Sequence, residues 1–191
     1  EWDRVNHSCY FSGFDNQEGL LITKDPCQDS LSLNARSVNY NLLNYNIDVN
    51  GVSQILMSLA TIVPDSSYVN ILPNGEINFL KNAVLNIDSK TLTQYDFYNA
   101  DIYLHSANSL SGKATFDYLD IEGSNQAINF TNFVLNDRIF SANASIDEKF
   151  NFQLSPYFSF KGKINFDSSK DYLLFNGETR VTLACDKLNQ S

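Results

Sequence analysis

The stretch NADIYLHS, residues 99–106, alternates apolar and polar side chains with a period of two. Two other stretches repeat its pattern: NAVLNIDS at residues 82–89 and NYNIDVNG at residues 44–51. Alternation of this kind is typical of a β-strand that buries one face and exposes the other. The three stretches therefore predict three strands, and they make an all-β fold the starting expectation.

Each of these strands is predicted to divide its residues between two faces. In residues 99–106 the face opposite the core carries Asp101, Tyr103 and His105. The residues predicted to face the core in the three stretches are Tyr45, Ile47, Val49, Ala83, Leu85, Ile87, Ala100, Ile102 and Leu104.

An asparagine begins each stretch: Asn44, Asn82 and Asn99. Asparagine tolerates left-handed backbone angles, and its side chain bonds to nearby backbone groups. We therefore predict that each of the three is a turn residue at the entry to a strand.

The architecture is predicted as one elongated β-rich domain over residues 1–191. Residues 1–29 form its N-terminal loop or edge region. The stretches recur at near-multiples of about 17 to 19 residues, which predicts either β-solenoid-like strands or a twisted meander over residues 30–135. An antiparallel β-sandwich is the alternative architecture.

Polar breaks between apolar alternations predict antiparallel hairpins over residues 136–183, which would form a closing sheet. The breaks fall at residues 136–138, 147–149 and 167–171. A fourth hairpin is predicted at Asn176-Gly177, because Asn-Gly between apolar runs is a strong short-range hairpin signal.

One helix is also considered, over residues 51–62. Ile55, Leu56, Leu59 and Ile62 have helical spacing there. The alternative is a strand that runs from Leu59 into the turn at Pro64-Asp65.

Composition excludes several classes of function. The formal net charge of −9 predicts repulsion from nucleic acid and from an anionic membrane surface. No apolar run reaches the roughly 18 residues of a transmembrane segment. The chain begins with Glu1, so we expect a mature or excised piece of a longer parent chain.

The three cysteines, Cys9, Cys27 and Cys185, form no metal-binding pattern. Cys9 and Cys27 flank a polar loop, and a disulfide between them is expected in an oxidising compartment. The alternative is three buried thiols that act as small apolar side chains.

No motif marks a catalytic, cofactor-binding or metal-binding residue, and we predict none. Asp117, Asp120 and Glu122 are a weak calcium candidate, because they lack the D-x-D-x-D-G pattern. The loop acids Asp15 and Glu18, with Asn16, are equally weak. His105 lacks the G-x-S-x-G motif of a nucleophile elbow, and a carboxylate pair for glycoside hydrolysis is defined only by distance in space.

Aromatic side chains offer a different kind of site. Tyr95, Tyr98, Tyr103 and Tyr157 are the candidates for a binding surface, because rings on an open β surface stack on sugars or contact a protein partner. The alternative is that these rings belong to the core.

The order of several phrases resembles a known group of proteins. The phrases run from about Ile55 to Cys185: ATIVPD, FLKNAVLNID, YDFYNADIYLHS, LSGKATFDYLDIEG, QAINFTNFVL, FNFQLSPYFSFKGKINF and DYLLFNGETRVTLAC. In these the chain resembles a segment of very large, uncharacterised cell-envelope proteins of Bacteroidota-type bacteria. The resemblance implies an exported, multidomain parent protein, and it carries no activity or site residues.

These observations predict a non-catalytic structural or interaction module of a large exported cell-envelope protein. Its partners would be proteins or glycans of the cell surface. Its location would be extracytoplasmic: periplasmic, outer-membrane-associated or at the cell surface. The alternative functions are a carbohydrate-binding or a lipid-binding β module.

Overall fold

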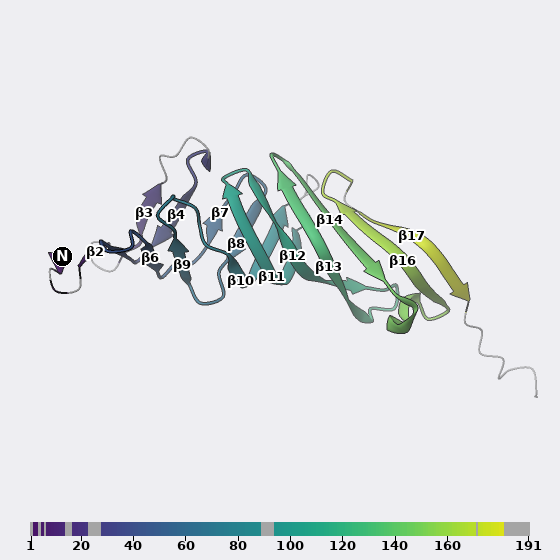
Figure 1. Ribbon diagram of the computed structural model, residues 1–191. Helices are drawn as coiled ribbons and strands as arrows, with labels where there is room; N and C mark the ends of the chain where they lie inside the picture. The colour runs from purple at the N-terminus through teal and green to yellow at the C-terminus, as the bar shows by residue number, and fades with distance from the viewer. Residues whose placement is uncertain are drawn as a thin grey trace, which may run out of the picture.

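The computed structural model describes residues 2–3, 5, 7–13, 17–22, 28–88, 94–170 and 172–181. Within these residues the regular structure consists of β-strands and short 3-10 segments, of which η3 spans Glu148–Phe150. The all-β class predicted from the alternation is therefore confirmed. Figure 1 shows an elongated molecule with a smaller group of strands at the N-terminal end and a large curved sheet beyond it.

The N-terminal strands form two small antiparallel sheets. One has the order β1-β2-β5-β6-β9, and the other is the hairpin β3-β4. Their bounds are β1 (Trp2–Asp3), β2 (Ser8–Ser12), β3 (Gly19–Ile22), β4 (Ser32–Ala35), β5 (Ser37–Asn41), β6 (Ile47–Asn50) and β9 (Tyr68–Ile71).

The remaining strands form one ten-stranded antiparallel sheet. From β10 to β14 each strand pairs with the next strand in sequence. Strands β10 to β14 therefore form a meander and not a solenoid, because a solenoid would stack its rungs in parallel. Strands β4, β5, β6 and β9, which also fall within the predicted range of residues 30–135, belong to the two N-terminal sheets instead. The bounds are β7 (Ile55–Leu56), β8 (Ala60–Val63), β10 (Leu80–Asp88), β11 (Gln94–Ser106), β12 (Ser109–Leu119), β13 (Asn125–Asn136), β14 (Ile139–Ile146), β15 (Phe152–Ser155), β16 (Phe158–Asp167) and β17 (Tyr172–Val181).

The helix considered for residues 51–62 is wrong, because β7 and β8 occupy this stretch and pair with each other. Ile55 and Ile62 are fully buried and lie opposite each other in the ladder. Apolar residues at helical spacing can equally be the inward residues of two short strands. The competing strand, which ends before Pro64, is the one that forms.

The predicted hairpin at Asn176-Gly177 is also wrong, since both residues lie within β17. Gly177 sits opposite Gly162 of β16, and a Cβ atom on Gly162 would come within 2.6 Å of the Gly177 Cα. The glycine therefore permits a close approach of two strands instead of a turn. The predicted hairpins at 136–138 and 167–171 are confirmed, because β13 pairs with β14 and β16 pairs with β17. The hairpin predicted at 147–149 is wrong, because β14 pairs with β16 and not with β15.

The buried faces predicted for residues 82–89 and 99–106 are confirmed. Ala83, Leu85 and Ile87 of β10 are fully buried. So are Ala100 and Ile102 of β11, and Leu104 is 6% exposed. The prediction is wrong for Tyr45, which is 58% exposed in the turn before β6 because it adopts left-handed angles there.

The repeated asparagines have two different roles. Asn44 is the predicted turn residue, and its side-chain oxygen accepts a hydrogen bond from the backbone N–H of Asn46. Asn82 and Asn99 instead lie inside β10 and β11, with φ angles of 52° and 49°. The ladder changes register at both positions, so each asparagine belongs to a β-bulge.

These bulges bend the sheet. Register shifts also interrupt the ladders between β12 and β13 and between β13 and β14, so irregularities occur in four successive ladders, from β10-β11 to β13-β14. A bulge bends its strand and increases the local twist. The two stretches at residues 82–89 and 99–106 therefore mark where the meander curves: asparagine takes the left-handed position, and the alanine after it faces the interior.

A substitution at Asn99 tests this account. Valine is expected to lower the free energy of unfolding by about 1–2 kcal/mol, because a side chain branched at Cβ is strained at left-handed angles. Glycine at the same position is expected to stay within about 0.5 kcal/mol of the wild type. Urea unfolding of the two variants measures both, and equal stability would show that Asn99 holds no left-handed bulge.

The curvature encloses a core of aromatic rings. Tyr95 of β11 and Phe166 of β16 have ring centroids 4.7 Å apart. Three strands separate β11 from β16, so in a flat sheet the two would be about 19 Å apart. Tyr118 of β12 and Phe175 of β17 meet in the same way at 5.6 Å. The sheet therefore curls over its own apolar face.

Candidate functional site

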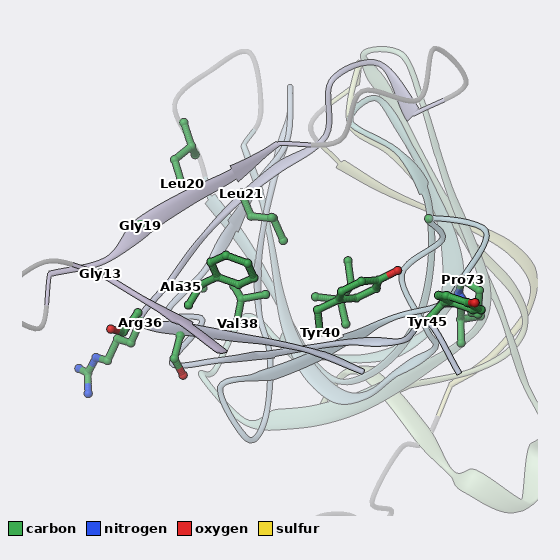
Figure 2. Close-up of a pocket in the computed structure, with 16 residues that line it drawn as sticks. Gly13, Gly19, Leu20, Leu21, Ala35, Arg36, Val38, Tyr40, Tyr45 and Pro73 are labelled. Carbon is green, nitrogen blue, oxygen red and sulfur yellow. The ribbon is translucent and has the colours of Figure 1, made fainter. Parts of the chain in front are cut away.

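An open hollow of about 780 Å³ lies in the N-terminal part of the molecule (Figure 2). The hairpin β3-β4 covers it from one side, and the sheet that contains β2, β5 and β6 forms the other. Figure 2 shows Leu21 pointing into the hollow, toward Val38, whereas Leu20 points away from it. The apolar residues that line the hollow include Phe11, Leu21, Val38, Ile47, Leu72 and Pro73.

The hollow exists because one chain segment belongs to two sheets. Residues 32–35 pair with β3, and after Arg36 the chain continues as β5, which pairs with β2 and β6. At the crossover the Arg36 N–H donates to the carbonyl of Asn50, and the Arg36 carbonyl accepts from Gly13. The two sheets diverge from this point, and Gly19 and Gly75 add no side chain to the space between them.

The wall of the hollow is almost uncharged. Arg36 is the one charged residue among the described lining residues, and its side chain points away from the hollow in Figure 2. Tyr40 and Tyr45, with ring centroids 6.5 Å apart, bring aromatic rings with polar hydroxyl groups. A mainly apolar wall with a few polar groups, and a volume within roughly 300–1,000 Å³, is typical of small-molecule sites.

Exposed apolar side chains surround the mouth of the hollow. Phe11 is 59% exposed and Leu20 is 64% exposed. These two come from β2 and β3, the strands that form the two sides of the opening. Grouped apolar exposure of this kind is typical of a surface that contacts a ligand or a partner.

The four tyrosines predicted as a binding surface lie in different environments. Tyr95 packs against the core, and Tyr98 and Tyr103 lie on the outer face of β11. Tyr103 packs on Phe79, with ring centroids 4.5 Å apart. Tyr157 is exposed in the turn between β15 and β16. The structure therefore places the four on no common face.

Tyr98 takes part in a polar contact across three strands. Its hydroxyl donates to Asp117 at 2.7 Å, and the Asn125 amide donates to the other carboxylate oxygen at 2.9 Å. These bonds lower the pKa of Asp117, and the bond to Asp117 raises the pKa of Tyr98. The stabilisation from Asp117 is therefore present above its ordinary pKa and is lost as the pH falls through its lowered value.

The other polar candidates make local bonds. Asp120 accepts from the backbone N–H groups of Glu122 and Ser124, which fixes the turn after β12. His105 is exposed, and its Nε2 lies 2.9 Å from the Ser111 hydroxyl. Asp15 and Asn16 lie outside the described residues, and Glu18 is exposed. In the part of the chain that the structure describes, no group of three or more His, Cys, Asp or Glu side chains could hold a metal ion.

The predicted disulfide involves one residue that is not described. Cys9 lies half-buried in β2, within the sheet that forms one side of the hollow. Cys27 and Cys185 lie outside the described residues. The bond between Cys9 and Cys27 therefore stays a prediction.

Sequence reasoning did not find the hollow. Its wall comes from short strands separated by loops, and β3 has no clear alternation, because three of its four residues are exposed. The only available signal was the apolar sequence Gly-Leu-Leu-Ile beside glycine-containing loops. That pattern also fits an ordinary edge strand.

Comparison with protein-family models, with curated proteins and with solved structures finds no significant match to this chain. Among the described residues, no helix has the length and apolar character needed to cross a membrane. The candidate site is therefore inferred from the structure of this chain, without support from a related protein.

Proposed function

We propose that the chain is a non-catalytic binding module whose N-terminal hollow takes an apolar small molecule, of the kind of a single lipid chain. The observation that carries the proposal is the open, apolar hollow of about 780 Å³ between β3-β4 and the β2-β5-β6 sheet. Burying an apolar chain there removes its surface from water at about 25 cal/mol per Å².

The chemistry of the wall favours a lipid chain over a sugar. A glycan needs many hydrogen-bonding groups, and the wall supplies mainly aliphatic and aromatic carbon. A charged ligand would lose its hydration without gaining a counter-charge, because Arg36, the one charged residue among the described lining residues, points outward. An uncharged, elongated apolar ligand has no hydrogen-bonding groups to leave unpaired and no charge to dehydrate.

The wider setting of the module is part of the same proposal. We place it in a large exported cell-envelope protein, outside the cytoplasm, where proteins or glycans of the surface would be its neighbours. The support is the acidic composition and the resemblance in phrase order described above. In this setting the curled sheet would act as a rigid support for the binding end.

Binding of a neutral apolar dye tests the proposal. Nile red is expected to bind the wild-type protein with a fluorescence increase, because the hollow excludes water from the dye. Replacing Leu21 by tryptophan is expected to weaken binding about tenfold or more, because the larger side chain occupies the hollow. Fluorescence titration at constant protein concentration measures both affinities.

An exposed leucine far from the hollow provides a matched control. Leu119→Trp makes the same exchange at a residue of β12 that is 64% exposed and does not line the hollow. Its affinity for the dye is expected to stay within about twofold of the wild type. An equal loss in both variants, or no dye binding by the folded wild type, would contradict the proposed function.

A further inference from the structure

Strand β17 lies at the outer end of the large sheet (Figure 1). Its ten residues pair with β16 in one continuous ladder that has no register shift. Among the described residues, no strand pairs with the opposite edge of β17. About half of its backbone N–H and C=O groups therefore point outward without a strand to bond.

The other edge strands in the described part of the chain are short. β1 and β7 have two residues each, and β3, β4, β9 and β15 have four each. Short length, prolines, lysines and bulges are common devices that keep a sheet edge from pairing with another chain. β17 has none of these devices, because it is long and regular and contains neither proline nor lysine. This edge can therefore accept one more strand.

The inner face of β17 carries apolar side chains that are only partly covered. Leu173 lies opposite Phe166 of β16, and Phe175 lies opposite Ile164. The two β16 residues are buried, whereas Leu173 and Phe175 are half-buried. A further strand beside β17 would cover the exposed part of both side chains. Such a strand would therefore extend the apolar core as well as bond the backbone of the edge.

We propose that this strand is β17 of a second copy of the chain, which pairs antiparallel about a two-fold axis through Gly177. A two-fold axis perpendicular to the sheet makes the pairing self-complementary. It also places inner-face residues opposite inner-face residues and outer-face residues opposite outer-face residues. The outward N–H groups of each copy then meet the outward C=O groups of the other, and the two large sheets become one.

The axis at Gly177 brings apolar side chains together. Leu173 then lies opposite Val181 of the second copy, and Phe175 lies opposite Thr179 of the second copy. Both pairs occur twice by symmetry, and all four residues belong to the inner face of the sheet. Cross-strand pairs of β-branched, aliphatic and aromatic side chains are favourable in antiparallel sheets.

The neighbouring registers are less favourable. An axis at Asn176 would place Phe175 opposite Gly177 and Leu174 opposite Glu178, so two large apolar side chains would lose apolar partners. An axis at Glu178 would place two carboxylates opposite each other, which is destabilising. Axes nearer to either end of β17 pair fewer residues of the strand. The register centred on Gly177 is therefore the one that the side chains favour.

Charge is also compatible with this register. Arg180 lies opposite Leu174 of the second copy, and Glu178 lies opposite a neutral side chain. Both charged groups already have partners within the chain: Arg180 bonds to Glu148 at 2.7 Å, and Glu178 meets Lys161 at 3.0 Å. The interface would therefore bring no like charges together, although the chain as a whole is acidic.

The dimer would carry two hollows, one at each end. The hollow lies in the N-terminal part of the elongated molecule, and β17 lies at the far end of the large sheet (Figure 1). Pairing through β17 leaves both hollows free. Dimerisation is therefore independent of the proposed ligand binding, and it would make the module bivalent.

Two substitutions of Leu174 with opposite charge test the interface. Leu174 is 49% exposed on the outer face of β17, so both variants are expected to fold. Leu174→Lys would put an ammonium group opposite Arg180 of the second copy at two symmetric places, and the dimer Kd is expected to rise about tenfold. Leu174→Glu would put a carboxylate there, and the Kd is expected to fall about threefold. Net charge alone predicts the reverse order, because Leu174→Glu makes an acidic chain more acidic.

Sedimentation equilibrium of the full chain, at protein concentrations up to about 1 mM, measures each Kd. The wild type is expected to show a monomer–dimer equilibrium. Leu119→Lys is the matched control, because it adds the same charge at a leucine of β12 that is 64% exposed, and its Kd is expected to stay within about twofold of the wild type. A wild type that stays monomeric throughout would overturn the inference. Equal Kd values for the two Leu174 variants, or the reverse order, would also overturn it.

Discussion

Replacing Phe97 by alanine is expected to lower the free energy of unfolding by about 3–5 kcal/mol. Phe97 is 1% exposed and lies in β11, on the inner face of the curled sheet. Its ring has four aromatic neighbours with centroids between 5.2 and 5.9 Å away: Phe116, Phe130, Phe140 and Phe166. Alanine would remove these contacts and leave a cavity where four other strands converge.

Phe150 provides the control for this substitution. It lies in η3, is 61% exposed, and its ring meets Lys149 with Nζ 5.5 Å from the centroid. Phe150→Ala is expected to cost about 1 kcal/mol or less. Urea unfolding compares the two variants. If Phe97→Ala costs no more than Phe150→Ala, the strands from β11 to β16 do not share one aromatic core.

The sequence predicted the inner faces of β10 and β11 because a strand repeats every two residues. Ala83, Leu85 and Ile87 follow from local alternation alone, and no information about other strands is needed. The same holds for Ile102 and Leu104. The fold class and the buried face of each strand are therefore encoded in the local sequence, and one sequence is enough to predict them.

The bulges and the close glycine pair could not be predicted in this way. An asparagine with left-handed angles fits a turn and a bulge equally well, and only the register of the neighbouring strand distinguishes them for Asn82 and Asn99. The role of Gly177 in the close approach of two strands becomes visible only with Gly162, which is fifteen positions away in the sequence and directly opposite in the ladder. These features depend on pairings that the sequence does not specify locally.

The candidate site depends on still longer-range relations. The hollow arises where β4 and β5 diverge at Arg36, and Gln28 meets Gly75 across 47 positions of sequence. The four tyrosines were predicted as a binding surface because they are aromatic. Residue type alone does not determine on which face of a strand a ring lies. Apolar residues that line a cavity and apolar residues that fill a core look alike until the opposing wall is known.

Replacing Leu104 by aspartate is expected to cost about 4 kcal/mol or more near neutral pH. Leu104 is 6% exposed and lies opposite Leu110, which is fully buried in β12. The change removes a buried aliphatic side chain and puts a carboxylate in its place without a partner. Burial would raise the pKa of the new carboxyl above its ordinary value of about 4. The destabilisation should therefore be smaller near pH 4, where the carboxyl is largely protonated in the folded state and about half protonated in the unfolded state, and should grow as the pH rises toward the raised pKa.

His105→Asp is the matched control, because it introduces the same side chain at the next position of β11. His105 is exposed on the opposite face, and its one polar contact is the Ser111 hydroxyl at 2.9 Å. The change is expected to cost about 1 kcal/mol or less, with no comparable growth above pH 4. Urea unfolding of both variants at two pH values measures the difference. Equal losses at residues 104 and 105 would mean that the two faces of β11 are not distinguished by burial, and the alternation in NADIYLHS would then lose its structural meaning.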